Sequence, residues 1–164
     1  MRIVEIKVMR GPNFWSVRRS KLIQMKLDLE EMEQKPTNLI PGFKERMEKL
    51  MPSLYEHRCS EGEPGGFFNR VIEGTWMGHV IEHIALELQT LAGMDTGFGR
   101  TRGTGVEGEY YVCFSYIEED AGVYAAKAAV RIAEALIADK LYDLSDDIQR
   151  LREIREDTRL GPST

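Results

Sequence analysis

Two segments near the start of the chain alternate apolar with polar residues, and this alternation limits the fold more than any other feature. They are RIVEIKVM (residues 2–9) and KLIQMKLDLE (residues 21–30). A period of two is typical of a strand with one buried and one exposed face, which puts Val4, Ile6 and Val8 on one buried face. The string RGPNFWS separates the segments with turn-forming residues. The two segments therefore predict adjacent antiparallel strands.

The next part of the chain changes to a helical pattern. A short helix is predicted within residues 40–54, with Pro52 closing it. The longest helical signal covers residues 67–92. Gly74 offers a break within this signal, and Thr75 offers a side-chain cap for its second half.

The second half of the chain repeats the order of two strands followed by helices. We predict strands in GFGRTRGTG and GEYYVCFSYIE, and helices in AGVYAAKAAVRIAEALIADK and LSDDIQRLREIREDTR, the last with Ser145 as its cap. The resulting order is β-β-α-α-β-β-α-α. Hairpins combined with helices predict an α+β fold, an antiparallel sheet with helices packed on one face.

Size and charge restrict the class of protein. The chain has 164 residues and a formal net charge of -5, which fits a single domain spanning residues 1–164 with its own core. The acidic balance argues against a nucleic-acid binder with a basic surface. No apolar run approaches the ~20 residues of a membrane span, and the charged start MRIVEIKVMR is not a signal peptide. Cys59 and Cys113 form no CxxC pair, which is typical of a protein from the reducing cytoplasm. From the charge and the lack of an apolar run, we expect neither nucleic acid nor membrane as a partner.

The segment GHVIEHIALELQ (residues 78–89) carries the residues most suited to chemistry. On a helix, His79 and His83 lie one turn apart on the same face, away from the apolar stripe. Two imidazoles at this spacing can bind one divalent ion, and Glu82 beside them can take a proton from water. The pattern His-x-x-Glu-His is an inverzincin signature. The alternative is a polar helix face without a chemical role.

A metal site of this kind needs a third protein ligand from elsewhere in the chain. On the same helix, Glu87 lies about 12 Å along the axis from His79, so the two are poorly placed to bind one ion. Glu87 is better placed to hydrogen-bond His83 from outside the ligand group. Cys113 is a further option, although a strand cysteine is more often a packed residue. The remaining candidates are the downstream acids Glu118, Glu119, Asp120, Glu134, Asp146, Glu153 and Glu156.

Four longer strings together resemble the N-terminal domain of cyanophycin synthetase, over essentially the whole chain. They are RGPNFWS, PGGFFNRVIEGTWMGHVIEHIALELQTLAGM, GFGRTR and RLGPST. The resemblance implies a synthetase that uses ATP to build cyanophycin, a polyaspartate with arginine on each side-chain carboxylate. Its ATP-grasp and Mur-ligase-like domains are absent from this chain. No GxxxxGK[ST] loop is present either, so we expect no ATP and no ligase activity here.

The resemblance also implies a function for the domain. It would bind the polymer, and with an intact His-x-x-Glu-His it would cleave cyanophycin as a pitrilysin-like zinc metallopeptidase, releasing short primers. His79 and His83 would be zinc ligands and Glu82 the general base. The implied third ligand is Glu153, about 70 residues after His83, with Glu156 and then Glu134 as alternatives. The alternative function is a non-catalytic cyanophycin-binding module that anchors the polymer.

Further residues suit an arginine-bearing and carboxylate-bearing polymer. Arg100 and Arg102 could hold its carboxylates or carbonyls, or could simply be a solvated strand edge. Trp15 and Trp76 could stack on guanidinium groups, although Trp76 adjoins the apolar stripe and is expected to be buried. An exposed strand edge could pair with an extended peptide, but the sequence does not indicate which edge is free.

Overall fold

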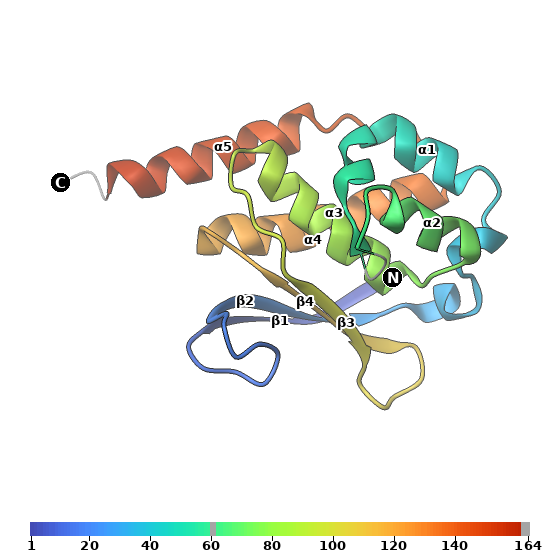
Figure 1. Cartoon of the computed structure of the whole chain (residues 1–164), viewed down its shortest axis with the longest axis horizontal. Coiled ribbons are helices and arrows are strands. Elements are labelled where there is room, and N and C mark those ends of the chain that lie inside the picture. The colour runs from blue at the N-terminus through green and yellow to red at the C-terminus, as the bar shows by residue number, and fades with distance from the viewer. Residues whose placement is uncertain (60–61, 162–164) are drawn as a thin grey trace.

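A single antiparallel sheet forms one layer of the molecule. The computed structural model describes residues 1–59 and 62–161, so the end of the RLGPST string lies outside the described residues. The sheet order is β1-β2-β4-β3 (Figure 1). Its strands are β1 (Arg2–Arg10), β2 (Lys21–Asp28), β3 (Gly99–Gly103) and β4 (Glu109–Ser115). The predicted strands and the antiparallel pairing of the first two are confirmed.

Helices form the second layer, and Figure 1 shows them on one side of the sheet. Within the described residues they are α1 (Phe43–Leu50), α2 (Gly66–Glu73), α3 (Met77–Leu91), α4 (Glu119–Ile137) and α5 (Ser145–Leu160), with short 3-10 helices η1 (Glu30–Gln34), η2 (Thr37–Leu39) and η3 (Pro52–Glu56). The predicted α+β architecture is confirmed. The long helical signal is divided at Gly74 into α2 and α3, which adds one helix to the expected order.

Helix α3 lies at the centre of the core. It packs against β3 and β4 of the sheet and against helices α4 and α5. Its apolar stripe is buried as predicted, with Val80, Ile81, Ile84 and Leu88 fully enclosed. Burial extends well beyond that stripe, because most of the helix circumference is covered. The polar side chains of α3 therefore do not form a solvated face.

The predicted side-chain caps of α3 and α5 were wrong. Helix α3 begins after Trp76, which makes no side-chain cap, and the hydroxyl of Thr75 instead contacts His79. At the start of α5, the backbone N–H of Ser145 donates to Asp143 Oδ1 at 2.9 Å. The cap position itself is Leu144. In both helices, the residue next to the predicted one occupies the cap position.

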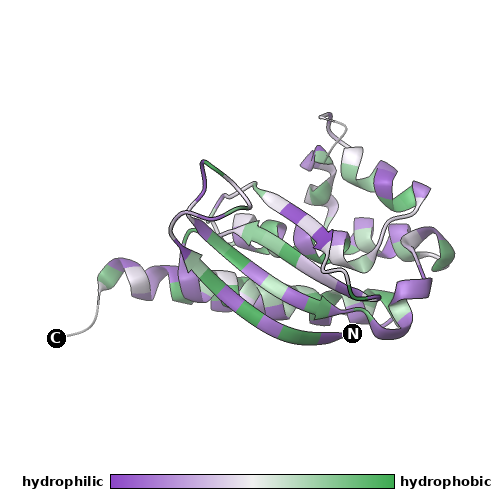
Figure 2. Ribbon diagram, turned by 90° about the horizontal axis from the view of Figure 1, so that it is seen from below, coloured by the Kyte–Doolittle hydropathy of each residue, from purple (hydrophilic) through white to green (hydrophobic). Residues whose placement is uncertain are grey.

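The buried face of β1 also differs from the prediction. A bulge between Ile3 and Glu5 shifts the register, and Val4 is 41% exposed. Figure 2, seen from the face away from the helices, shows hydrophobic and hydrophilic residues alternating along the strands. On that outer face the Trp15 side chain covers Leu22 and Cys113. Among the described helices, none is long and apolar enough to cross a membrane.

Candidate metal centre

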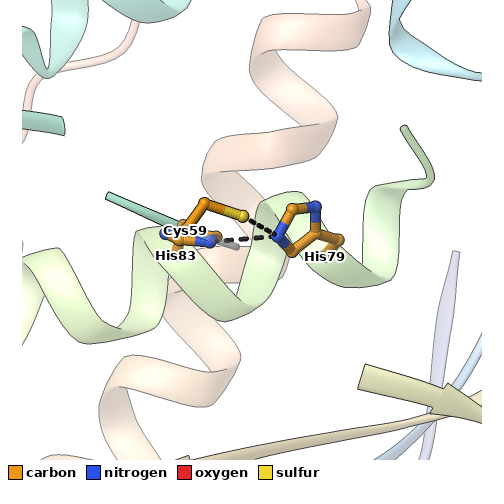
Figure 3. Close-up of side chains that lie close together, drawn as sticks. All are labelled: Cys59, His79 and His83. Atoms are coloured by element: carbon orange, nitrogen blue, oxygen red, sulfur yellow. Dashed lines mark hydrogen bonds between the residues drawn. The ribbon is translucent and has the colours of Figure 1, made fainter. Parts of the chain in front are cut away.

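Three side chains converge beside α3 with their ligand atoms close together. His79 Nε2 lies 3.0 Å from His83 Nε2 and 3.2 Å from Cys59 Sγ (Figure 3). The ligand atoms of all three residues lie within 4.8 Å of one another. Tetrahedral zinc with bonds of about 2.0 Å to nitrogen separates two ligand nitrogens by about 3.3 Å. The group therefore has the donor types and the spacing that can hold a metal ion.

Local structure brings these residues together. His79 and His83 occupy successive turns of α3, as their spacing predicted. Cys59 comes from the segment after η3, where a left-handed backbone with φ of 53° turns the chain toward α3. Such a conformation is uncommon for a residue with a side chain and indicates that the surroundings impose it.

Both imidazoles use Nδ1 for contacts with the protein, which leaves Nε2 directed at the metal-capable group. His79 Nδ1 lies 3.0 Å from Thr75 Oγ1, and His83 Nδ1 lies 2.8 Å from His57 Nδ1. Glu87, predicted as a partner of His83, contacts His57 Nε2 instead at 2.7 Å. Outer partners of this kind orient metal-binding histidines and fix their protonation.

The electrostatic surroundings favour neutral histidines. Burial, followed by the nearby Arg70 guanidinium, lowers the pKa of His79 to about 4. Burial, followed by the neighbouring His79 and His57 rings, holds the pKa of His83 well below its usual value. A histidine must be neutral at the coordinating nitrogen to bind a metal, so both rings are in the competent form near neutral pH.

Glu82 is enclosed between α3 and β3. Burial raises the pKa of its carboxyl group to about 7, although a hydrogen bond from Thr101 opposes the rise. Thr101 Oγ1 donates that bond to Glu82 Oε2 at 2.6 Å. The close approach of helix and strand requires glycine at position 99, because a Cβ there would lie 2.6 Å from Glu82 Cδ. A carboxylate with this pKa suits proton transfer at neutral pH.

The structure does not bring the predicted third ligand to the histidines. Glu153 lies on α5, and its carboxylate contacts Gln149 and Arg150 of the same helix. Helix α5 meets the far end of α3, where Arg152 and Arg155 donate to backbone carbonyls beyond His83. The alternatives Glu156 and Glu134 are also outside the group, paired with Arg155 and the N-terminal amine.

Cys113 is a packed strand residue, which was the alternative to a metal ligand in the sequence analysis. It is fully buried in β4 beneath Trp15, and burial raises the pKa of its thiol to about 12. The two residues that sequence reasoning missed are Cys59 and His57. A signal was present, since the short string HRC places two potential ligands two positions apart and contains the one histidine outside the helix motif.

A cavity of about 1050 Å³ opens beside the metal-capable group, and Glu82, Arg100 and Arg102 also line it. Thr101 faces Glu82, so its neighbours Arg100 and Arg102 project from the opposite face of the sheet, at the edge of β3. There their guanidinium groups lie over the aromatic rings of Phe98 and Trp15, 5.7 Å from each centroid. The expectation that Trp76 is buried was wrong, because Trp76 is 39% exposed and lines the cavity. Trp15 is buried on the outer face of the sheet, where the guanidinium group over its ring is that of Arg102.

The cavity wall carries both signs of charge along a free strand edge. The sheet order gives β3 a single strand neighbour, β4, within residues 1–59 and 62–161. The outer edge of β3 borders the cavity. The carboxylate and guanidinium residues of the wall are Glu56, Glu82, Glu87, Asp95, Arg58, Arg70, Arg100 and Arg102. This arrangement suits an extended ligand that carries both carboxylates and cations.

Comparisons with known proteins agree on one family. Residues 24–138 match the family described as cyanophycin synthase-like N-terminal domain. The chain is 54% identical to a cyanophycin synthetase of Geminocystis herdmanii and 51% identical to one of Synechocystis, in each case over 100% of the chain. A third relative, the cyanophycin synthetase of Crocosphaera subtropica, is 50% identical. The chain spans 19% of the length of each of these three relatives.

Proposed function

The chain belongs to the family of cyanophycin synthase-like N-terminal domains, and from this premise we propose that it binds cyanophycin and cleaves it as a zinc-dependent endopeptidase. Cleavage within the polymer would release short chains that serve as primers for polymerisation. One observation carries the proposal: a metal-capable group and a buried carboxylate with a pKa of about 7 line the same cavity.

We assign the metal ligands to His79, His83 and Cys59. Two imidazoles and a thiolate suit zinc and leave a fourth position for water or substrate. Cys59 takes the place first predicted for Glu153, whose carboxylate is engaged on α5. A bound zinc ion supplies Lewis-acid chemistry that polarises a carbonyl and makes water a nucleophile near neutral pH.

Glu82 is the proposed general base. Its carboxylate lines the cavity, and its raised pKa makes both protonation states accessible near pH 7. In its ionised form it would take a proton from the attacking water. The same carboxyl group would then pass that proton to the leaving amine as the peptide bond breaks. Thr101 holds the carboxylate in place throughout.

The cavity wall matches the chemistry of the proposed substrate. Arg100 and Arg102, whose guanidinium groups lie on the outer face at the edge of β3, would bind carboxylates or carbonyls of a polymer that passes over that edge. Within the cavity, Glu56 and Asp95 would meet its arginine side chains. The free edge of β3 would align the extended backbone through main-chain hydrogen bonds. In the cytoplasm, the further partners would be the ATP-grasp and Mur-ligase-like domains of the same synthetase.

A second candidate function is a non-catalytic module that holds the polymer. The observation that favours it is the wall of mixed charge beside a free strand edge, which suffices for binding without a metal. This function predicts polymer binding that a chelator does not change, and polymer chains that stay long.

The test compares wild type, Glu82→Gln and the matched control Glu48→Gln, an exposed acid on α1. Each is incubated with cyanophycin, polymer length is followed by gel, and bound zinc is measured. We expect wild type and Glu48→Gln to shorten the polymer, and Glu82→Gln to keep zinc but lose cleavage. Full cleavage by the Glu82 variant would contradict the mechanism, and no cleavage by wild type would leave the binding module.

A further inference from the structure

A continuous row of hydrogen bonds leads from a buried carboxylate to the metal-capable group. Ser53 donates its hydroxyl to Glu87 Oε1, and Glu87 Oε2 lies 2.7 Å from His57 Nε2. His57 Nδ1 lies 2.8 Å from His83 Nδ1, and His83 Nε2 lies 3.0 Å from His79 Nε2. The row therefore enters the metal-capable group at Nε2 of His83.

This row is enclosed by the protein. The side chain of Glu87 is 4% exposed and that of His57 is 17% exposed. The ring of Phe67 stacks on His83 with centroids 4.2 Å apart, which restricts rotation of that ring. These side chains border the cavity, but their small exposed fractions favour the hydrogen bonds between them over bonds to water.

The chemistry of these groups assigns the protons one after another. An ionised carboxylate only accepts hydrogen bonds, so His57 Nε2 must donate to Glu87. A neutral imidazole carries one N–H, so His57 Nδ1 is left with a lone pair. His83 Nδ1 must then donate to it, which leaves the lone pair of His83 on Nε2.

We infer that His57 and Glu87 are positioning residues that hold His83 in the Nδ1–H tautomer, with its Nε2 lone pair directed at Cys59 and His79. The use of that lone pair for a metal rests on the proposed function. The proton assignment itself takes Glu87 as an ionised carboxylate and His57 as a neutral ring, and then follows from the hydrogen-bond geometry.

His79 is arranged differently, because its outer partner is a hydroxyl. Thr75 Oγ1 can either donate to or accept from His79 Nδ1. In the metal-free chain, the lone pair of His83 requires a donor, so His79 carries its proton on Nε2 and Thr75 donates to Nδ1. A metal ion held at Nε2 would require that proton on Nδ1, where Thr75 Oγ1 can accept it. His83 is thus preset for the metal and His79 changes tautomer.

The first test is nuclear magnetic resonance of the ring nitrogens in the metal-free chain. The chain contains 3 histidines, so each ring can be assigned. We expect His57 in the Nε2–H form and His83 in the Nδ1–H form. On adding zinc, His79 alone should change from Nε2–H to Nδ1–H. His83 in the Nε2–H form, or His57 in the Nδ1–H form, would overturn the inference.

The second test measures zinc affinity by competition with a chelator. His57→Phe removes both hydrogen bonds, and we expect affinity to fall about 10–100-fold. His57→Asn keeps an acceptor near His83 Nδ1, so it should recover part of that loss. The matched control is Leu54→Val, which trims a buried residue of η3 outside the row and should leave affinity unchanged.

The two tests separate the inference from the proposed function. If wild type binds no zinc, the proposed function fails, and the tautomers of the metal-free chain still decide the role of His57. If zinc binds and His57→Phe binds it as tightly as wild type, the positioning role fails while the metal site stands. A folded His57→Phe variant is recognised by an unfolding transition as cooperative as that of Leu54→Val.

Discussion

Replacing Glu82 with glutamine should change how the free energy of unfolding of the metal-free chain depends on pH. The pKa of this carboxyl group is about 7 in the folded chain, against 4.5 when exposed. Between these values the folded chain binds more protons than the unfolded chain, so stability falls as pH rises through this window. Linkage gives a loss of about 2.5 kcal/mol between pH 5 and pH 8 that the glutamine variant does not suffer.

The assay is thermal and urea unfolding of both chains at pH 5 and pH 8 with a chelator present. For a chain of this size, the difference between the variants should change by about 5–10 °C in Tm between the two pH values. His79 titrates in the opposite sense, because its pKa is lowered to about 4 and its contribution is lost on acidification. That contribution is common to both chains and cancels in the comparison.

The control for this prediction is Glu48→Gln, which removes an exposed carboxylate on α1. Its stability should follow that of wild type at both pH values. If the Glu82→Gln and wild-type curves also ran parallel from pH 5 to pH 8, Glu82 would not be enclosed as described, and the argument for its role as a base would fail.

Three further predictions concern the site and its support. Cobalt-loaded chain should show thiolate-to-cobalt charge-transfer absorption that Cys59→Ser abolishes; its absence from wild type would point to a carboxylate ligand. Gly99→Ala should displace the Glu82 carboxylate and abolish polymer cleavage, whereas Gly97→Ala, with no atom near its added Cβ, should cleave normally. Asp147→Ala should lower the free energy of unfolding by about 2–3 kcal/mol, measured in urea, because Tyr124, Arg131 and Tyr142 all donate to this buried carboxylate.

Local periodicity predicted the parts of the molecule that depend on local structure. Alternating residues predicted β1 and β2, and helical spacing placed His79 and His83 on one face. The bulge at Val4 was not predictable, because a register shift depends on pairing across strands. Periodicity also could not reveal that packing on several sides of α3 buries Glu82.

Contacts between segments distant in sequence account for the missed parts of the site. Cys59 and His57 reach α3 from a loop, and no pattern within that loop indicates where it lies. The prediction of Glu153 rested on family spacing along the chain. Its position is set instead by how α5 packs, with Arg152 and Arg155 holding that helix to the far end of α3.

The most direct test of the central claim is a time course of cyanophycin length with one preparation of the chain in three states: zinc-loaded, chelated and zinc-restored. The account predicts shortening in the first state, none in the second and recovery in the third. Polymer that binds the chain but keeps its length in all three states would contradict a metallopeptidase and leave a binding module.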